Sequence, residues 1–373
     1  MSAGIADSTA SGFASSTITR ASDDELLEWL HENRRTDGLP VVLPTPDRVR
    51  ELVLAAEYAG YDPDLVLGRI GPSNGQATIE KIAVNAVMAG CRPEHMPVVV
   101  AAVKALCDPR LDTTEIQATT HNLAPLTIVN GPVRADAGLH GGYGVFGYGH
   151  RANLSIGRAV RLCMINLGGG WPGVSDMTVM GHPGKISFCI AEDEENSPFP
   201  PLHTSRGFTA EQSAVTLVCV SAPHQMLIRT ESDVPESPGN VLDLIAATIA
   251  GLGNNNSYVQ SGTVVVCLNP DHARFLADAG YDRAAIQQEL FERASNPTSV
   301  INRFTYGLLG TDADQSEPWR ALESPDSVLV VVTGGSGLYS AVLPSWGLGP
   351  HKNTAVSYEV VTTDMCEIPL RVE

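Results

Sequence analysis

The alternation of short apolar runs with helical segments constrains the fold of this chain most strongly. The run VLVVV at 328–332 is continuous and rich in valine, which is typical of a strand buried on both faces. Further strands are predicted at 39–44, 127–130, 186–191, 213–220, 263–268, 339–343 and 355–361. Helices are predicted at 23–34, 46–58, 75–90, 97–106, 153–167, 240–251, 271–279 and 283–294. This order predicts an α/β fold with mixed or parallel sheets and helices packed outside.

Two domains are expected after an N-terminal tail. Residues 1–22 are rich in Ser, Thr, Ala and Gly, which predicts a disordered tail. We expect an α/β domain at 23–210 that carries a Gly-rich site region, and a second α/β domain at 211–373 packed on the first. A strand-like run, Pro-Asp, a helix and the letters AGYD follow one another at 39–62 and again at 264–282. Either the chain contains two related halves, or two strand–helix units share common turn chemistry.

Charge and cysteine content restrict the partners and the compartment. The formal net charge is −18, whereas a nucleic-acid surface needs a basic stripe. We therefore expect no nucleic-acid partner and no membrane partner. The 7 cysteines show no CxxC spacing, and the N-terminus lacks the apolar core of a signal peptide. Both features predict a reduced protein of the cytoplasm.

One stretch, residues 117–206, combines glycine-rich turns with reactive side chains. A glycine-rich loop lets the backbone approach a ligand, and the loop at 141–149 leads into a helix that starts near Arg151. Arg158 is expected on roughly the same helix face, so that the two guanidinium groups would bind an anion. The alternative is a pair of arginines on a solvated face. The candidate substrate-binding residues are Asn130, Arg151, Asn153, Arg158 and Lys185.

Acid–base residues are expected near the same region. His121 and His203 are the preferred proton-transfer residues, ahead of the histidines at 150 and 182. Glu80 and Lys81 lie in a helix that is apolar on nearly all sides. Because buried charges are paired or functional, this pair is a candidate partner for the histidines. The alternative is a solvated stripe on an amphipathic helix.

The acidic run 192–195 follows a predicted strand. Glu192 and Glu194 share one face of an extended chain, where they would hold a divalent metal ion or act as acid and base. The alternative is a solvated strand end, and Glu192 is the preferred catalytic carboxylate. Asn130 has two equal interpretations, as a ligand-orienting residue or as part of a plain Asn-Gly turn. Cys91 is the only cysteine in a polar setting, which makes it the candidate nucleophile.

Four phrases carry a resemblance to a known family: EKIAVNAVMAGCRPEHMPVV, QATTHNLAPLTIVNGP, GHRANLSIGRAVRL and VVVTGGSGLYSAVLPSWG. They resemble a bacterial family associated with UGSC-motif selenoprotein-like proteins, over most of the chain after residue 38. The motif of that family joins selenocysteine or cysteine to Gly-Ser-Cys. No cysteine of this chain lies in such a context. The resemblance therefore implies the companion polypeptide of a redox-active protein, and it implies no reaction.

These observations favour an enzyme. We expect it to act on a small anionic, carboxylate-bearing metabolite by acid–base chemistry of the lyase or hydrolase type. The arginines, histidines and one carboxylate of the central stretch are then expected to converge on one cavity. Two alternatives are a metal-dependent oxidoreductase with histidine ligands and a non-catalytic subunit of a partner redox protein. No HxH, HExxH or CxxC pattern supports a zinc site. We also expect a homo-oligomer.

Overall fold

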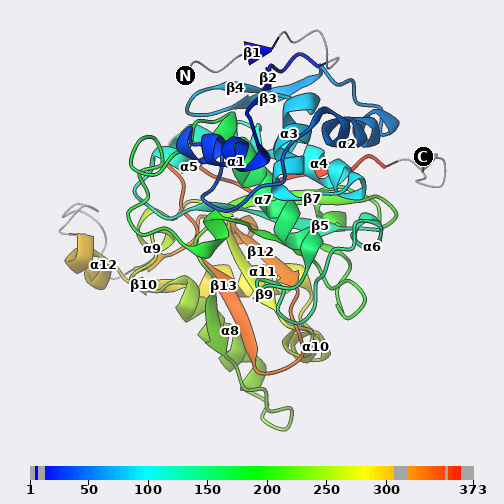
Figure 1. Cartoon of the computed structure of the whole chain (residues 1–373). Coiled ribbons are helices and arrows are strands. Elements are labelled where there is room, and N and C mark those ends of the chain that lie inside the picture. Colours follow the sequence, from blue (N-terminus) through cyan, green and yellow to red (C-terminus); the bar gives the residue numbers. More distant parts are fainter. Residues whose placement is uncertain (1–4, 7–12, 306–316, 349–351, 363–373) are drawn as a thin grey trace.

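Two four-stranded sheets pack face to face at the centre of the computed structural model, which describes residues 5–6, 13–305, 317–348 and 352–362. Helices cover the outer side of each sheet, so that the layers follow the order helix, sheet, sheet, helix (Figure 1). The predicted α/β fold with mixed sheets and outer helices is confirmed. No helix of the described chain combines the length and the apolar character that crossing a membrane requires.

The first sheet has the strand order β14-β7-β5-β6. Its strands are β5 (Ala124–Asn130), β6 (Cys189–Ala191), β7 (Ala214–Val220) and β14 (Val356–Glu359). β5 and β6 are parallel, whereas β7 is antiparallel to both β5 and β14. Its outer helices are α2 (Pro46–Tyr58), α3 (Ile79–Ala89), α4 (Met96–Leu106) and α7 (Arg151–Asn166). Around them lie α1 (Asp23–Glu32), β3 (Val66–Ile70), β4 (Gly75–Thr78), α5 (Thr113–Ala118) and α6 (Val133–Asp136).

The second sheet has the strand order β12-β9-β13-β8. Its strands are β8 (His224–Leu227), β9 (Val264–Leu268), β12 (Val328–Val332) and β13 (Tyr339–Leu343). Helices α8 (Ser237–Ile249), α10 (Pro270–Asp278) and α11 (Arg283–Arg293) cover its outer face. The smaller elements of this half are α9 (Asn256–Val259), β10 (Ser295–Pro297), α12 (Thr298–Thr305) and β11 (Pro318–Arg320).

Burial on both faces explains why the central strands are continuous apolar runs. Along β9, Val264 and Val266 pack with the outer helices, whereas Val265 and Cys267 pack between the sheets. This alternation follows from the two-residue period of a strand. Each central strand therefore removes apolar side chains from water on two sides, which contributes about 25 cal/mol per Å² of buried apolar surface.

The two sheets have the same strand directions. In each sheet a parallel pair (β5 with β6, β9 with β12) is extended by two antiparallel strands. In this comparison β5 matches β9. β5 ends at Asn130, and Asn269 follows the last residue of β9; a proline lies close behind each asparagine. The AGYD phrases do not mark this correspondence, because 264–268 is β9, whereas 39–44 belongs to no strand.

The expected domain boundary at residue 210 does not separate the two sheets. β7 and β14 both follow that position, yet both belong to the first sheet. The predicted strand at 39–44 is wrong, because this segment lies against the helical layer, where Val42 N donates to Met88 O at 3.2 Å. The helix predicted from residue 75 begins later, since 75–78 form β4.

Part of the expected N-terminal tail contacts the folded body. Strand β1 (Ile5–Ala6) pairs with β2 (Thr17–Ile18). The backbone amides of Ala14 and Ser15 each donate to the carboxylate of Glu80 at 2.8 Å. Residues 13–22 therefore form a segment that lies across α3, in contrast to the predicted disordered tail.

Candidate functional site

The candidate residues of the central stretch lie in separate places. His121 and Lys185 lie where β5 begins, whereas Asn130 and Glu192 lie where β5 and β6 end. A strand advances about 3.3 Å per residue, so that the length of β5 separates these two groups by roughly 20 Å. The expected convergence of all these side chains on one cavity is therefore wrong.

A buried arginine whose side chain has no hydrogen-bond partner within the described residues lies near the start of β5. Arg161 belongs to α7 and is 5% exposed. Its Nε and Nη2 atoms have no partner among the residues that the structure describes. Burial lowers the pKa of Arg161, and the nearby carboxylate of Asp176 partly offsets this effect. A guanidinium stays charged in proteins, so that its buried N–H groups need an acceptor.

Lys185 and Asp176 form an ion pair beside Arg161. The distance from Nζ to Oδ2 is 2.9 Å, and Nζ also donates to Thr178 Oγ1 at 2.6 Å. Burial lowers the pKa of Lys185 and the charge of Arg161 lowers it further, while Asp176 opposes both. Because one carboxylate compensates two buried cations, the group has an excess positive charge.

Two histidines adjoin this ion pair. Burial, and then the charge of Lys185, lower the pKa of His121. Its Nε2 lies 3.5 Å from Ser221 Oγ, and its buried Nδ1 has no partner within the described chain. The same two causes lower the pKa of His182 to about 4. Both imidazoles are therefore neutral near pH 7. We call Arg161, Asp176, Lys185, His121 and His182 the Arg161 cluster.

The loop at 171–185 builds one side of this cluster. It docks against the residues before β5, where Met177 N donates to Gln117 O at 3.2 Å. Gly173 and Gly181 have φ angles of +72° and +67°, a left-handed backbone that favours glycine. The two glycines thus turn the chain twice, and the loop places Lys185 and His182 beside His121 and Arg161.

At the opposite end of the sheet, Glu192 joins the two sheets. It is fully buried, and its Oε1 accepts from Arg283 Nη2 at 2.9 Å. Its Oε2 accepts from Asn130 Nδ2 at 2.5 Å and from Leu202 N at 2.6 Å. These donors occupy both carboxylate oxygens, in contrast to the acid–base or metal-binding role expected of Glu192. The contacts are those of a structural ion pair.

Asn130 orients two carboxylates rather than a ligand. Its Nδ2 also donates to Glu194 Oε1 at 2.9 Å, so Glu192 and Glu194 do face the same side. Arg134 Nη2 lies 2.9 Å from carboxylate oxygens of both Glu194 and Glu195. Three of the four carboxylates of the acidic run therefore form ion pairs with arginines of the chain itself. This differs from both the solvated strand end and the divalent metal site considered from the sequence.

The other expected anion-binding residues have partners of their own. Arg158 forms a bidentate pair with Asp37, with N–O distances of 2.7 and 2.8 Å. Exposed Arg151 donates to the backbone oxygen of Gly90 at 3.1 Å. Asn153 exchanges two hydrogen bonds of 2.9 Å with the backbone of His140. These contacts fix α7 to its neighbours, and they leave the anion-binding role of the three residues without support.

Two further catalytic candidates are buried. His203 is fully buried, and its Nε2 lies 2.9 Å from Thr209 O. Cys91 is also buried, and burial raises the pKa of its thiol well above the usual range. The burial of Cys91 argues against the nucleophilic role predicted for it. A thiol that stays protonated at neutral pH is a poor nucleophile.

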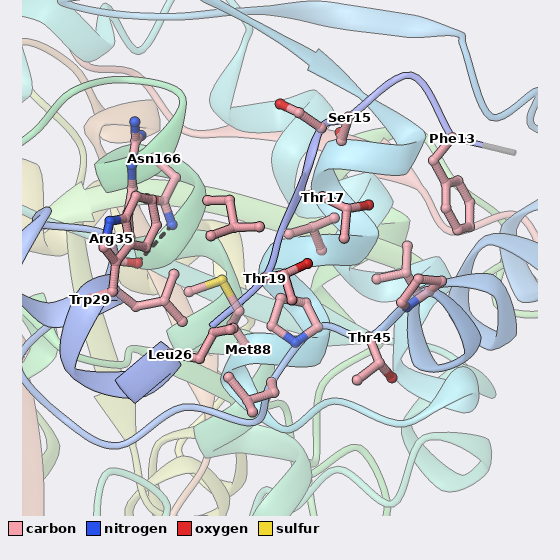
Figure 2. Close-up of a pocket in the computed structure, with 18 of the residues that line it drawn as sticks. Phe13, Ser15, Thr17, Thr19, Leu26, Trp29, Arg35, Thr45, Met88 and Asn166 are labelled. Carbon is pink, nitrogen blue, oxygen red and sulfur yellow. Dashed lines mark hydrogen bonds between the residues drawn. The ribbon is translucent and has the colours of Figure 1, made fainter. Parts of the chain in front are cut away.

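Glu80 and Lys81 line a cavity of about 610 Å³ on the helical side of the first sheet. Figure 2 shows the segment that carries Ser15, Thr17 and Thr19 passing along one side of this cavity. Glu80 is buried, as predicted from the apolar helix around it. The backbone amides of Ala14 and Ser15 donate to its carboxylate. Among the described residues, Glu80 does not contact the candidate histidines.

Arg161 is the residue that the sequence interpretation missed. It stands within the apolar run 159–164, where only its own side chain is charged. The argument applied to Glu80 and Lys81, that a charge on an all-apolar helix is buried, would have found it.

The chain has no significant match among protein-family models, curated proteins or solved structures. The family resemblance therefore stays a prediction. Within the described residues, no three or more His, Cys, Asp or Glu side chains come together as a metal site.

Proposed function

We propose that the protein is an enzyme that binds a small carboxylate-bearing metabolite at the Arg161 cluster and transfers a proton through His121. One observation carries this proposal: Arg161 is buried with two N–H-bearing nitrogens that have no acceptor in the described chain. A buried cation without a partner costs several kcal/mol, so that a folded protein keeps one where an anion compensates it. A planar guanidinium favours a carboxylate, which it can hold with two parallel hydrogen bonds.

The charge balance of the cluster supports an anionic ligand. Arg161 and Lys185 contribute two positive charges, and Asp176 contributes one negative charge. A ligand carboxylate therefore brings the buried group to neutrality. In an environment of low dielectric constant this compensation is stronger than at a protein surface.

His121 has the properties of a general base. Its depressed pKa keeps the ring neutral, and a neutral imidazole has a lone pair on one nitrogen. Removal of a proton from the carbon beside a bound carboxylate moves that proton to His121 and leaves the electron pair on the substrate. The cations of Arg161 and Lys185 stabilise the charge that develops there. This is the first step of lyase chemistry.

Binding and proton transfer are tested separately. Thermal unfolding is measured with a panel of small mono-, di- and tricarboxylates, with Arg161→Met compared against Arg151→Met on the same helix. At a ligand concentration of 100 times Kd, stability rises by about 2.7 kcal/mol in proteins that bind. We expect this rise in the wild type and in Arg151→Met, and not in Arg161→Met. An equal response of Arg161→Met would contradict the proposal.

The proton transfer is followed by NMR in D₂O. A carboxylate that stabilises the protein is incubated with it, and the signal of the proton beside the carboxylate is recorded over time. We expect the wild type to exchange this proton for deuterium and His121→Asn to lose the exchange while it retains binding. If His121→Asn exchanges at the rate of the wild type, the role assigned to His121 is wrong.

A further inference from the structure

We propose that the cavity beside α3 is a second ligand site, distinct from the Arg161 cluster, and that it takes an elongated apolar molecule with one anionic headgroup. The cavity, of about 610 Å³, lies between the segment 13–23, α1, α3 and the end of α7. This volume falls within the roughly 300–1,000 Å³ that is typical of small-molecule sites. Figure 2 shows Leu26, Trp29 and Met88 around its interior.

The lining is apolar along most of its length. Its aliphatic and aromatic side chains come from three separate segments, and they include Leu26, Trp29, Leu30, Leu43, Val84 and Met88. The cavity is partly open to solvent, and no residue of α1 is fully buried. A concave surface of this size that is lined mainly by apolar side chains is suited to an apolar ligand.

The charged residues at the cavity indicate the sign of the headgroup. Lys81, Arg20 and Arg35 line it, against the two acids Asp23 and Glu80. The carboxylate of Glu80 already accepts two backbone amides of the N-terminal segment. For the half-buried ammonium of Lys81, the described residues offer no ion pair or hydrogen bond. The cavity of an otherwise acidic protein thus has an available cation, which favours an anion.

One further polar atom at this end of the cavity, the buried Asn166 Oδ1, has no partner among the described residues. Asn85 lies one helical turn from Lys81, and Asn166 Nδ2 donates to Asn85 Oδ1 at 2.7 Å. An unpaired acceptor is costly in a filled core, whereas a cavity that is open to solvent admits a water molecule that donates to it. A carboxylate only accepts hydrogen bonds, so the headgroup is placed at the ammonium of Lys81, and water supplies the donor to Asn166.

The N-terminal segment forms a removable wall of this site. Residues 13–22 lie across α3, and the two amides of Ala14 and Ser15 fasten them to Glu80. Displacing this segment breaks two hydrogen bonds to a charged acceptor and removes Phe13 from the core and from Arg50, and it opens the cavity without unfolding a helix. Entry of a ligand therefore requires only a local rearrangement.

The site is tested by isothermal titration with dodecanoate, dodecanol and dodecyltrimethylammonium, which differ in headgroup charge, at concentrations below micelle formation. We expect dodecanoate to bind most tightly and the ammonium compound least. Lys81→Met should weaken dodecanoate binding about tenfold and leave dodecanol unchanged, since a charged hydrogen bond contributes about 1.4 kcal/mol or more. Lys104→Met, a variant of a lysine on the neighbouring helix α4, serves as the matched control and should change neither affinity.

A variant that fills the cavity gives an independent result. Val84→Trp is expected to abolish binding of both dodecanoate and dodecanol. Should it fail to fold, the Lys81→Met comparison still decides the outcome. Arg161→Met should leave dodecanoate binding unchanged, which separates this site from the proposed active site. The proposal is overturned if dodecanoate does not bind, if the ammonium compound binds equally well, or if Lys81→Met and Lys104→Met behave alike.

Discussion

Replacement of Glu192 by alanine should destabilise the protein strongly. The carboxylate is 0% exposed, the Arg283 side chain that faces it is 9% exposed, and their N–O distance is 2.9 Å. Without Glu192, the guanidinium of Arg283 remains buried with no counter-charge. Breaking a buried ion pair from one side costs about 3–5 kcal/mol, because it leaves an uncompensated charge. The loss of the hydrogen bonds from Asn130 and Leu202 acts in the same direction.

The expected cost of Glu192→Ala is therefore about 4 kcal/mol in the free energy of unfolding. We compare it with Glu323→Ala, which breaks an exposed pair with Lys352 whose side chains are 53% and 48% exposed. Exposed pairs contribute about 0–1 kcal/mol. The assay is urea denaturation at pH 7, followed by tryptophan fluorescence.

The double variant Glu192→Met/Arg283→Met tests the reasoning itself. It removes both charges, so that it should be more stable than Glu192→Ala, even though more side chains have changed. If Glu192→Ala costs no more than Glu323→Ala, or if the double variant is as unstable as the sum of its single variants, the ion pair is not what Glu192 contributes.

Three further results are expected. Gly157→Ala should destabilise the protein by about 1–3 kcal/mol, because the new Cβ would lie 2.5 Å from the backbone nitrogen of Phe188. Gly239→Ala, whose new Cβ would have no atom within 4 Å, should instead stabilise α8 by about 0.5–1 kcal/mol. Thermal unfolding measures both changes. The pKa of His182 is about 4 in the folded chain, against 6.5 for an ordinary histidine, because the folded protein disfavours the charged ring. The contribution of His182 to the stability of the fold is therefore complete above pH 6.5 and is lost as the pH falls toward 4. Between pH 7 and 4.5 the free energy of unfolding should fall by about 2–3 kcal/mol through this effect, and the His182→Gln variant should lack this fall. An equal fall in the variant would show that His182 is not its source. Burial raises the pKa of the Cys91 thiol, so a disulfide reagent should label it only after unfolding in urea. Peptide mapping of the labelled protein measures this.

Local sequence patterns predicted most of the secondary structure. Helix α2 begins at Pro46 as predicted, because proline at the first helical position needs no hydrogen-bond partner. β12 matches the run VLVVV, since a strand buried on both faces has no polar side chain. The segment 39–44 has the same apolar character but lies outside both sheets. Apolar side chains alone do not specify a strand, because a strand also needs a neighbour with which to pair.

The candidate site was predictable only in part. His121 and Lys185 do lie near each other, because the loop at 171–185 returns to the residues before β5. Glu192 was assigned a catalytic role from its position after a strand, yet its partner Arg283 comes from a helix of the other half. The two residues are 91 positions apart in the sequence, and no local pattern indicates their contact.

The sequence by itself determined the α/β class, the helical and strand periodicities and the burial of Glu80, because each depends on side chains within a few residues of one another. The tertiary structure decided which polar groups meet. The two sheets take strands from distant parts of the chain, so that β14 completes the sheet of β5 and β7. That arrangement pairs Glu192 with Arg283 and buries Arg161 where the described residues offer two of its nitrogens no acceptor. Contacts across the chain depend on strand order, which local side-chain patterns do not specify.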